Sequence, residues 1–190
     1  LYASPVFMYT EKYTNPILSF TYIYDWEMWR YSFFLSRSAR FEESQIVNDI
    51  TKGGIKIFYF TPMGVLGSRL SLFHGLHLDR TEQIAFGGTF VRGYPYLFNR
   101  GDIAYLSTLE YRTPPVQVWV LALGGVLFFD AGQTLNKGDN LSPLASVGFG
   151  LRGNIARFDD TLFRLDVGFP LQKSPNGVLN QVSFGLQQVF

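Results

Sequence analysis

Apolar and polar residues alternate one by one through several segments of about ten residues, and this feature constrains the fold most strongly. Over 161–171, for example, the odd-numbered positions are apolar from 163 to 169, and Arg164, Asp166 and Gly168 stand between them. Successive side chains of a β-strand point to opposite faces, so this pattern predicts two-faced strands. The same alternation recurs over 102–113, 116–130, 144–152 and 179–190.

The predicted connections between strands have two lengths. Thr113-Pro114-Pro115 and Thr61-Pro62-Met63-Gly64 are tight turns, because proline has no N–H to donate to a sheet. The connections over 38–51, 79–101 and 131–141 are longer and polar or rich in glycine. Short turns on one rim and long loops on the other are typical of an outer-membrane barrel.

The amino-terminal third leaves the number of strands open. We expect 17–37 to form one long strand, because Asp25-Trp26 is a poor turn sequence. This gives eight strands in all. A hairpin in the same segment, together with a strand at 2–12, would give ten, and either number is even, as in most bacterial single-chain barrels.

The charged residues within the predicted strands fall on the face opposite the apolar one. They are Lys56, Arg69, Glu110, Arg112, Asp130, Arg152, Arg164 and Asp166. In a soluble sandwich such charges would face water, whereas in a membrane barrel they would line the lumen and the apolar face would contact lipid. Tyr105, Tyr111, Trp119 and Phe169 lie near strand ends on the apolar face, where interfacial aromatic girdles form, and they favour the membrane barrel. We therefore predict an all-β, antiparallel up-and-down transmembrane barrel, formed by residues 1–190 as a single domain in a lipid bilayer.

Several functional classes are disfavoured by the composition. A formal net charge of +1 gives no basic surface for nucleic acid, and without cysteine no thiolate site or nucleophile can form. His74 and His77 are three positions apart on a strand and point to opposite faces, so no metal site is expected. Gly87, Gly88 and Gly93 lack the lysine and the following helix of a phosphate-binding loop. No catalytic set of residues is found, so we expect neither an enzyme nor a cofactor.

The sequence Gly87-Gly88-Thr89-Phe90-Val91-Arg92-Gly93-Tyr94 resembles the VRGF/VRGY signature of the BamA-type outer-membrane surface antigen superfamily. This superfamily includes barrel-assembly insertases, TamA-like proteins and two-partner secretion transporters. Further segments follow in the family's order, namely LEYRTPP, LFFDAG, VGFGLR, FRLDVGFPL and a final strand ending in Phe190. The resemblance covers about residues 64–190. Family members usually carry periplasmic domains before a 16-stranded barrel, and we expect neither within this chain.

The resemblance implies a role for the Val91-Arg92-Gly93-Tyr94 motif. In the family this motif tips a long loop that folds back into the lumen, where the arginine pairs with the aspartate of a Phe-x-Asp motif, here Phe128-Phe129-Asp130. A guanidinium withdrawn from water requires a carboxylate in good geometry, and the alternation places Asp130 on the lumen face. Glu110 and Asp166 are alternative acceptors. Arg92 could instead be a solvated residue on a mobile loop.

The end of the chain resembles an outer-membrane sorting signal, with Ser183, Gly185 and the terminal Phe190, which the cell's barrel-assembly machinery would read. The resemblance as a whole implies a protein of a Gram-negative-type outer membrane that assists assembly or insertion of client outer-membrane proteins. The alternative is a structural or interaction barrel, either a membrane anchor or a subunit of a homo-oligomer.

Overall fold

The computed structural model describes residues 2–9, 14–42, 45–79, 81–88, 90–95, 98–119, 121–136, 138–155, 161–172 and 181–188. Within these ranges the chain is all-β. The strands are β1 (Tyr2–Tyr9), β2 (Thr14–Trp26), β3 (Trp29–Glu42), β4 (Gln45–Thr61), β5 (Gly64–Leu76), β6 (Ile84–Phe86), β7 (Asn99–Gly101), β8 (Ile103–Arg112), β9 (Val116–Val118), β10 (Leu121–Leu135), β11 (Leu144–Ile155), β12 (Thr161–Pro170) and β13 (Gln181–Gln188). No helix in the described ranges is long and apolar enough to cross a membrane.

Eleven of these strands form one antiparallel sheet. Ten follow the path β1-β2-β3-β4-β5-β8-β10-β11-β12-β13, and β9 pairs with β10 beside this path. Strands β6 and β7 form a separate two-stranded sheet within the long connection from β5 to β8. Apart from β6, β7 and β9, each strand therefore pairs with the strand that follows it along the chain. This confirms the predicted up-and-down antiparallel arrangement.

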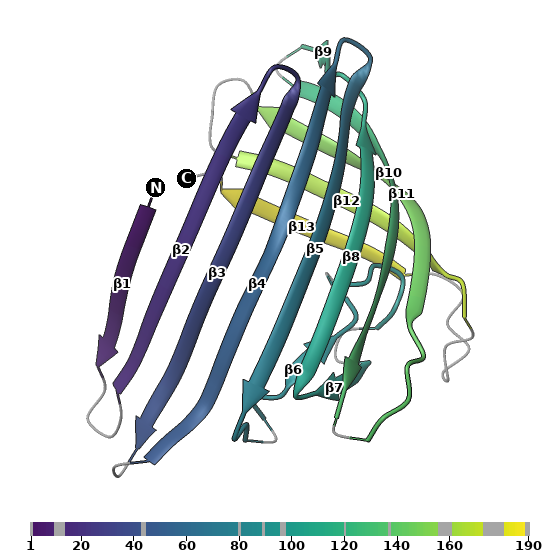
Figure 1. Cartoon of the computed structure of the whole chain (residues 1–190). Coiled ribbons are helices and arrows are strands. Elements are labelled where there is room, and N and C mark those ends of the chain that lie inside the picture. Colours follow the sequence, from purple (N-terminus) through teal and green to yellow (C-terminus); the bar gives the residue numbers. More distant parts are fainter. Residues whose placement is uncertain are drawn as a thin grey trace.

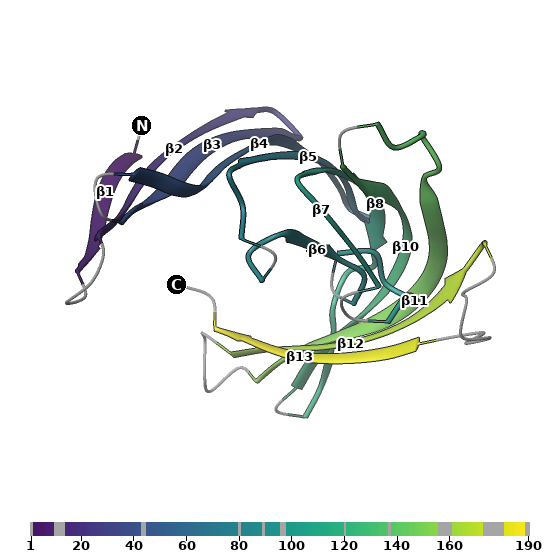
Figure 2. The same ribbon diagram turned by 90° about the horizontal axis from the view of Figure 1, so that it is seen from below.

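The sheet curls strongly but does not close (Figure 2). In the part of the chain that the structure describes, β1 pairs only with β2 and β13 pairs only with β12. Figure 2 shows the two ends of the sheet facing each other across a gap, with β6 and β7 inside the curve. The predicted closed barrel is therefore not observed, and the structure shows an open, curled sheet instead.

The expectation of one strand over 17–37 is wrong. The segment contains a hairpin, in which Trp26 at the end of β2 pairs with Trp29 at the start of β3. The turn is Glu27-Met28 rather than Asp25-Trp26, and Glu27 adopts a left-handed φ of 51°. A non-glycine residue is disfavoured there, but the long register between the two strands fixes the turn. The main path consequently holds ten strands rather than the preferred eight, although an open sheet gives no strand number for a closed barrel.

Other predicted boundaries also differ from the structure. The connection predicted over 131–141 begins as strand, because β10 extends to Leu135. The segment 38–51 is mostly strand, since β3 extends to Glu42 and β4 begins at Gln45. The predicted strand over 116–130 is interrupted at Trp119, which has a φ of 55° and lies at the turn between β9 and β10. The polar residues of 38–51 made that segment resemble a loop. The continuous apolar run around Trp119 gave no sign of the interruption there.

The two faces of the sheet have the polarity expected of a membrane barrel. Large apolar side chains are exposed on the outer face, including Leu35, Leu72, Leu127, Phe149 and Leu151. The inner face instead buries polar and charged side chains, including Ser71, Glu110, Asp130, Ser146 and Asp166. Because a soluble protein buries its apolar face, this arrangement favours lipid around the outer face.

The short turns and the long loop lie at opposite ends of the sheet (Figure 1). The β2–β3 turn, the β4–β5 turn and β9 are at one end, and β6 and β7 are at the other. A small apolar core, formed by Phe86, Val91, Tyr94 and Leu106, joins the long connection to the sheet. This core holds the connection in place beside the inner face.

Candidate functional site

The connection from β5 to β8 folds into the concave side of the sheet (Figure 2). Its tip makes tight turns, with φ values of 100° at both Gly87 and Gly93. A Cβ on Gly87 would come within 2.0 Å of the Pro95 carbonyl oxygen, so only glycine fits this closely folded backbone. The Gly88 amide donates a hydrogen bond to the Tyr94 carbonyl oxygen at 2.8 Å and closes the turn around the motif.

Arg92 contacts three carboxylates on the inner face of the sheet. Its Nε and Nη2 donate to the two oxygens of Asp130 at 2.7 and 2.8 Å, a bidentate geometry. Its Nη1 donates to Glu110 at 2.9 Å and lies 3.4 Å from Asp166. The backbone N–H of Arg92 also donates to Asp130, at 3.2 Å. The expected partner and both alternative acceptors therefore surround one guanidinium.

The Arg92 side chain is only 3% exposed, which excludes the solvated, mobile alternative for this residue. Its charge is offset by Asp130, which is 1% exposed and has no second ion pair among the described residues. Glu110 and Asp166 are themselves paired with other cations. Asp130 thus depends on Arg92 more than the other two carboxylates do.

The aromatic residue of the Phe-x-Asp motif lies under the same guanidinium. The Arg92 guanidinium carbon is 3.4 Å from the centroid of the Phe128 ring. At this distance a cation over an aromatic face is attracted by the ring's quadrupole. Gly148 on β11, directly opposite Phe128, leaves the space that the ring occupies, because a Cβ there would be 2.3 Å from the ring. The loop cation is therefore held from below by a ring and from the sides by carboxylates.

Three more arginines surround the carboxylates. Arg112 donates to Glu110 at 2.6 Å, while Arg152 and Arg164 each donate to Asp166 at 2.6 Å. These side chains come from β8, β11 and β12, so the network ties the inner faces of neighbouring strands together. Buried charges are tolerated only when paired and hydrogen-bonded, and here the pairing is shared among several groups.

Tyr94, the last residue of the motif, is fully buried. Its hydroxyl lies 3.0 Å from the Ala145 carbonyl oxygen and 2.7 Å from the Gln172 side-chain oxygen, and these two acceptors share its one hydrogen. Its ring packs against Phe98 with centroids 5.3 Å apart. Because burial removes the phenolate from water, it raises the pKa of Tyr94 and keeps the hydroxyl a donor. The tyrosine fixes the loop to the ends of β11 and β12.

The predicted sorting signal is placed only in part. Ser183 and Gly185 lie on β13, opposite Asp166 and Arg164 of β12. Phe190 lies outside the described residues. The residues that sequence reasoning did not single out are Gly148, Gly168 and Gln172. A signal for the first two existed, since both glycines fall on the charged face of the alternation where small residues leave room for a loop.

No group of three or more His, Asp or Glu side chains within the described ranges has a geometry that could hold a metal ion. Arg92 of the loop and the strand residues Glu110, Asp130 and Asp166 form an ionic clamp on the inner face of the curled sheet. This clamp fixes the loop to the strands.

Comparison with known protein families identifies the chain. The Omp85 superfamily domain matches residues 60–190, which is more than half of the sequence. The chain belongs to the Omp85 superfamily. Members of the Omp85 superfamily are outer-membrane proteins, and the match confirms the BamA-type resemblance drawn from the motifs. It begins at the end of β4 and contains the whole clamp. No curated protein matches the chain.

Proposed function

We propose that this Omp85 superfamily chain forms part of an outer-membrane barrel that assists the insertion of other barrel proteins into the membrane. The observation that carries the proposal is the loop held on the inner face by Arg92, Asp130 and Phe128. In the family that the chain resembles, this loop folds into the lumen of insertases and translocases. The mechanism would combine local thinning of the bilayer with a weak seam between the first and last strands.

The outer face supports the membrane part of the proposal. Leu18, Leu35, Leu72 and Leu127 are each more than half exposed on strands spread along the sheet. Such a surface is stable only in contact with lipid or another apolar surface, since a soluble monomer rarely exposes so large an apolar area. Tyr24, Tyr31, Trp29 and Tyr59 cluster near the short-turn end, as residues of an interfacial girdle would.

The loop clamp supports the part of the proposal that concerns insertion of other barrel proteins. An insertase needs a β-sheet that opens between two strands while the remaining strands keep their arrangement. The clamp joins β8, β10 and β12 through one side chain, so these strands form a stiff block on one side of the sheet. Opening would then be confined to the part of the sheet away from the clamp.

A direct test reconstitutes the protein in liposomes and follows the folding of a urea-denatured client barrel by gel-shift. We expect the wild-type protein to accelerate folding over empty liposomes and Arg92→Ala to reduce the acceleration. Arg30→Ala is the matched control, because Arg30 forms an exposed pair with Asp25 on β2 and β3, which carry no residue of the clamp. A client folding rate equal to that in empty liposomes would overturn autonomous insertion for that client.

The second candidate function is an interaction barrel that pairs with another copy. The specific observation in its favour is the open sheet, in which β1 and β13 each have one strand partner in the described part of the chain. Unpaired edges are templates for pairing with another strand. Sedimentation in a density-matched neutral detergent distinguishes the two. A stable dimer without client-folding activity would favour the interaction barrel.

A further inference from the structure

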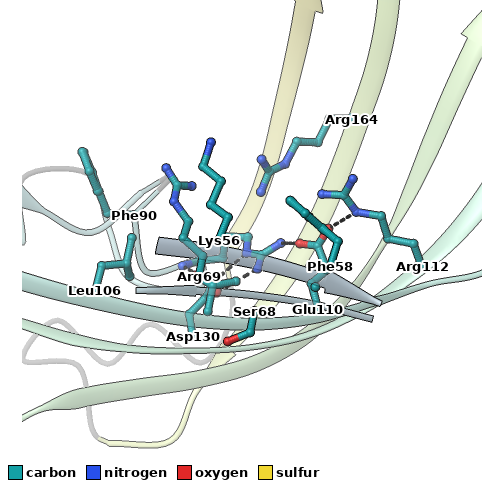
Figure 3. Close-up of a pocket in the computed structure, with 13 residues that line it drawn as sticks. Lys56, Phe58, Ser68, Arg69, Phe90, Leu106, Glu110, Arg112, Asp130 and Arg164 are labelled. Atoms are coloured by element: carbon teal, nitrogen blue, oxygen red, sulfur yellow. Dashed lines mark hydrogen bonds and ion pairs between the residues drawn. The ribbon is translucent and has the colours of Figure 1, made fainter. Parts of the chain in front are cut away.

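A cavity of about 250 Å³ lies beside the clamp on the inner face (Figure 3). Five cationic side chains and two carboxylates are among its lining residues, so its charge is unbalanced toward positive. The cations are Lys56, Arg69, Arg92, Arg112 and Arg164. Three of these are paired with carboxylates of the clamp, as described above. Lys56 and Arg69 are the remaining two.

Lys56 on β4 is directly opposite Arg69 on β5. Neither forms a hydrogen bond or ion pair with a carboxylate among the residues the structure describes; Lys56 lies only near the Phe34 ring, at 5.9 Å. Like charges directly opposite on neighbouring strands destabilise a sheet. Asp130 and Glu110 attract Arg69 at longer range without forming an ion pair with it, so the repulsion between Lys56 and Arg69 is offset only in part.

The two side chains extend side by side from their strands into the cavity, and Arg164 approaches it from the other side (Figure 3). Thr108, next to Arg69 across the sheet, adds a hydroxyl that can donate to an oxyanion. Lysine and arginine together provide a point charge and a planar set of donors, a combination suited to phosphoryl oxygens.

We propose that Lys56 and Arg69 form a binding site for a phosphoryl oxyanion inside the curled sheet. Two unit charges that form no ion pair among the described residues favour a group carrying about two negative charges, such as a phosphate monoester or a diphosphate, over a single carboxylate. The site adjoins the Arg92 clamp, since Arg92, Glu110 and Asp130 also line the cavity, and its existence does not depend on insertion activity. The same chemistry is available from a soluble phosphate or from a lipid headgroup with a terminal phosphate.

The test measures binding of sodium pyrophosphate to the protein in a neutral detergent by calorimetry at constant ionic strength. We expect saturable binding to the wild type, and affinity reduced about tenfold or more in Lys56→Gln and in Arg69→Gln, because each removes a charge-assisted contact. Lys52→Gln is the matched control, since Lys52 lies on the same strand and outside the cavity.

The variants also have a signature that a folding defect would not produce. Without pyrophosphate, Lys56→Gln should unfold at the same or a higher temperature than the wild type, because one of two opposed like charges has been removed. Circular dichroism checks the fold of each variant. Absence of saturable binding to the wild type, or equal affinity in wild type and both cavity variants, would overturn the proposal.

A competition arm identifies the source of the oxyanion. Neutral micelles with and without phosphatidic acid, which carries a terminal phosphate, are added to the protein with bound pyrophosphate. Displacement by phosphatidic acid that depends on Lys56 and Arg69 supports the site and assigns it to a lipid headgroup. Retention of pyrophosphate supports the site and assigns it to a soluble phosphate.

Discussion

Gly93 of the long loop lies directly against Gly168 of β12. A Cβ on Gly168 would come within 2.5 Å of the Gly93 nitrogen and 2.6 Å of the Arg92 carbonyl carbon. The loop backbone and the strand backbone are therefore in contact without side chains between them. This close approach is what brings the Arg92 guanidinium down to the level of the carboxylates.

Gly168→Ala should displace the loop from the sheet, because the new methyl group would overlap with backbone that cannot move aside as a side chain would. We expect faster proteolytic cleavage within the loop of the folded protein, measured by limited proteolysis in detergent. Gly125→Ala is the matched control, since a Cβ there would meet only Thr113 at an ordinary 3.6 Å. Equal cleavage of both variants would show that the close contact does not hold the loop.

Arg92→Ala should lower the free energy of unfolding by about 3–5 kcal/mol, because it leaves Asp130 buried without its cation. Urea unfolding followed by tryptophan fluorescence measures the change. Arg30→Ala should change stability by about 1 kcal/mol or less, since its pair with Asp25 is exposed. A similar loss in the two variants would contradict the special position of Arg92.

Arg92→Lys should recover only part of this loss. Lysine supplies the charge but not the planar, bidentate donors that contact Asp130 while also reaching Glu110. The stability of Arg92→Lys is therefore expected between those of Arg92→Ala and the wild type in the same urea experiment. Full recovery would mean that charge alone, rather than donor geometry, fixes the loop.

Phe128→Leu should destabilise the protein by removing the ring beneath the guanidinium, a contact worth about 0.5–2 kcal/mol, and by leaving space above Gly148. Phe129→Leu is the control on the outer face, where the ring is 40% exposed. We expect looser loop attachment, measured by hydrogen exchange of the 90–95 amides, only in Phe128→Leu. Equal exchange in both variants would argue against a role for the ring.

A pH effect is expected where the long loop begins. Asp79, beyond the end of β5, accepts hydrogen bonds from Asn48 at 2.8 Å and from Arg40, and these hold the pKa of Asp79 below its usual value. A lowered folded-state pKa contributes stability above the unfolded pKa of about 3.9, which is lost as the pH falls through the folded value. Asp79→Asn should therefore be less stable to urea than the wild type at neutral pH. The difference in stability should become smaller in strong acid. A difference independent of pH would contradict this linkage.

Much of the candidate site follows from sequence alone. The alternation places Glu110, Asp130 and Asp166 on one face, and the family motif singles out Arg92 as their partner. The sequence did not indicate which acceptor would be used, because the choice depends on how strands far apart in the chain approach one another. In the structure Arg92 reaches acceptors 18, 38 and 74 residues away and uses all three.

The strand boundaries were harder to predict where local and tertiary preferences conflict. The Glu27-Met28 turn carries no glycine or asparagine, and its left-handed residue is imposed by the pairing of β2 with β3. Similarly, the polar stretch 38–51 looks like a loop, yet β3 and β4 pair with each other through it, and Asn48 and Asp49 within β4 are buried. Pairing with neighbouring strands overrides the local signal in both places.

The sequence by itself determined the strand type, the two opposed faces and the family, because period-two alternation and short motifs are local properties of the chain. Only the tertiary structure decided how the loop is held. Strand register decides three contacts of the inner face. In these contacts Phe128 packs over Gly148, Gly93 lies against Gly168, and Lys56 lies opposite Arg69. Register is fixed by the pairing of whole strands, so it is established only when the curled sheet forms.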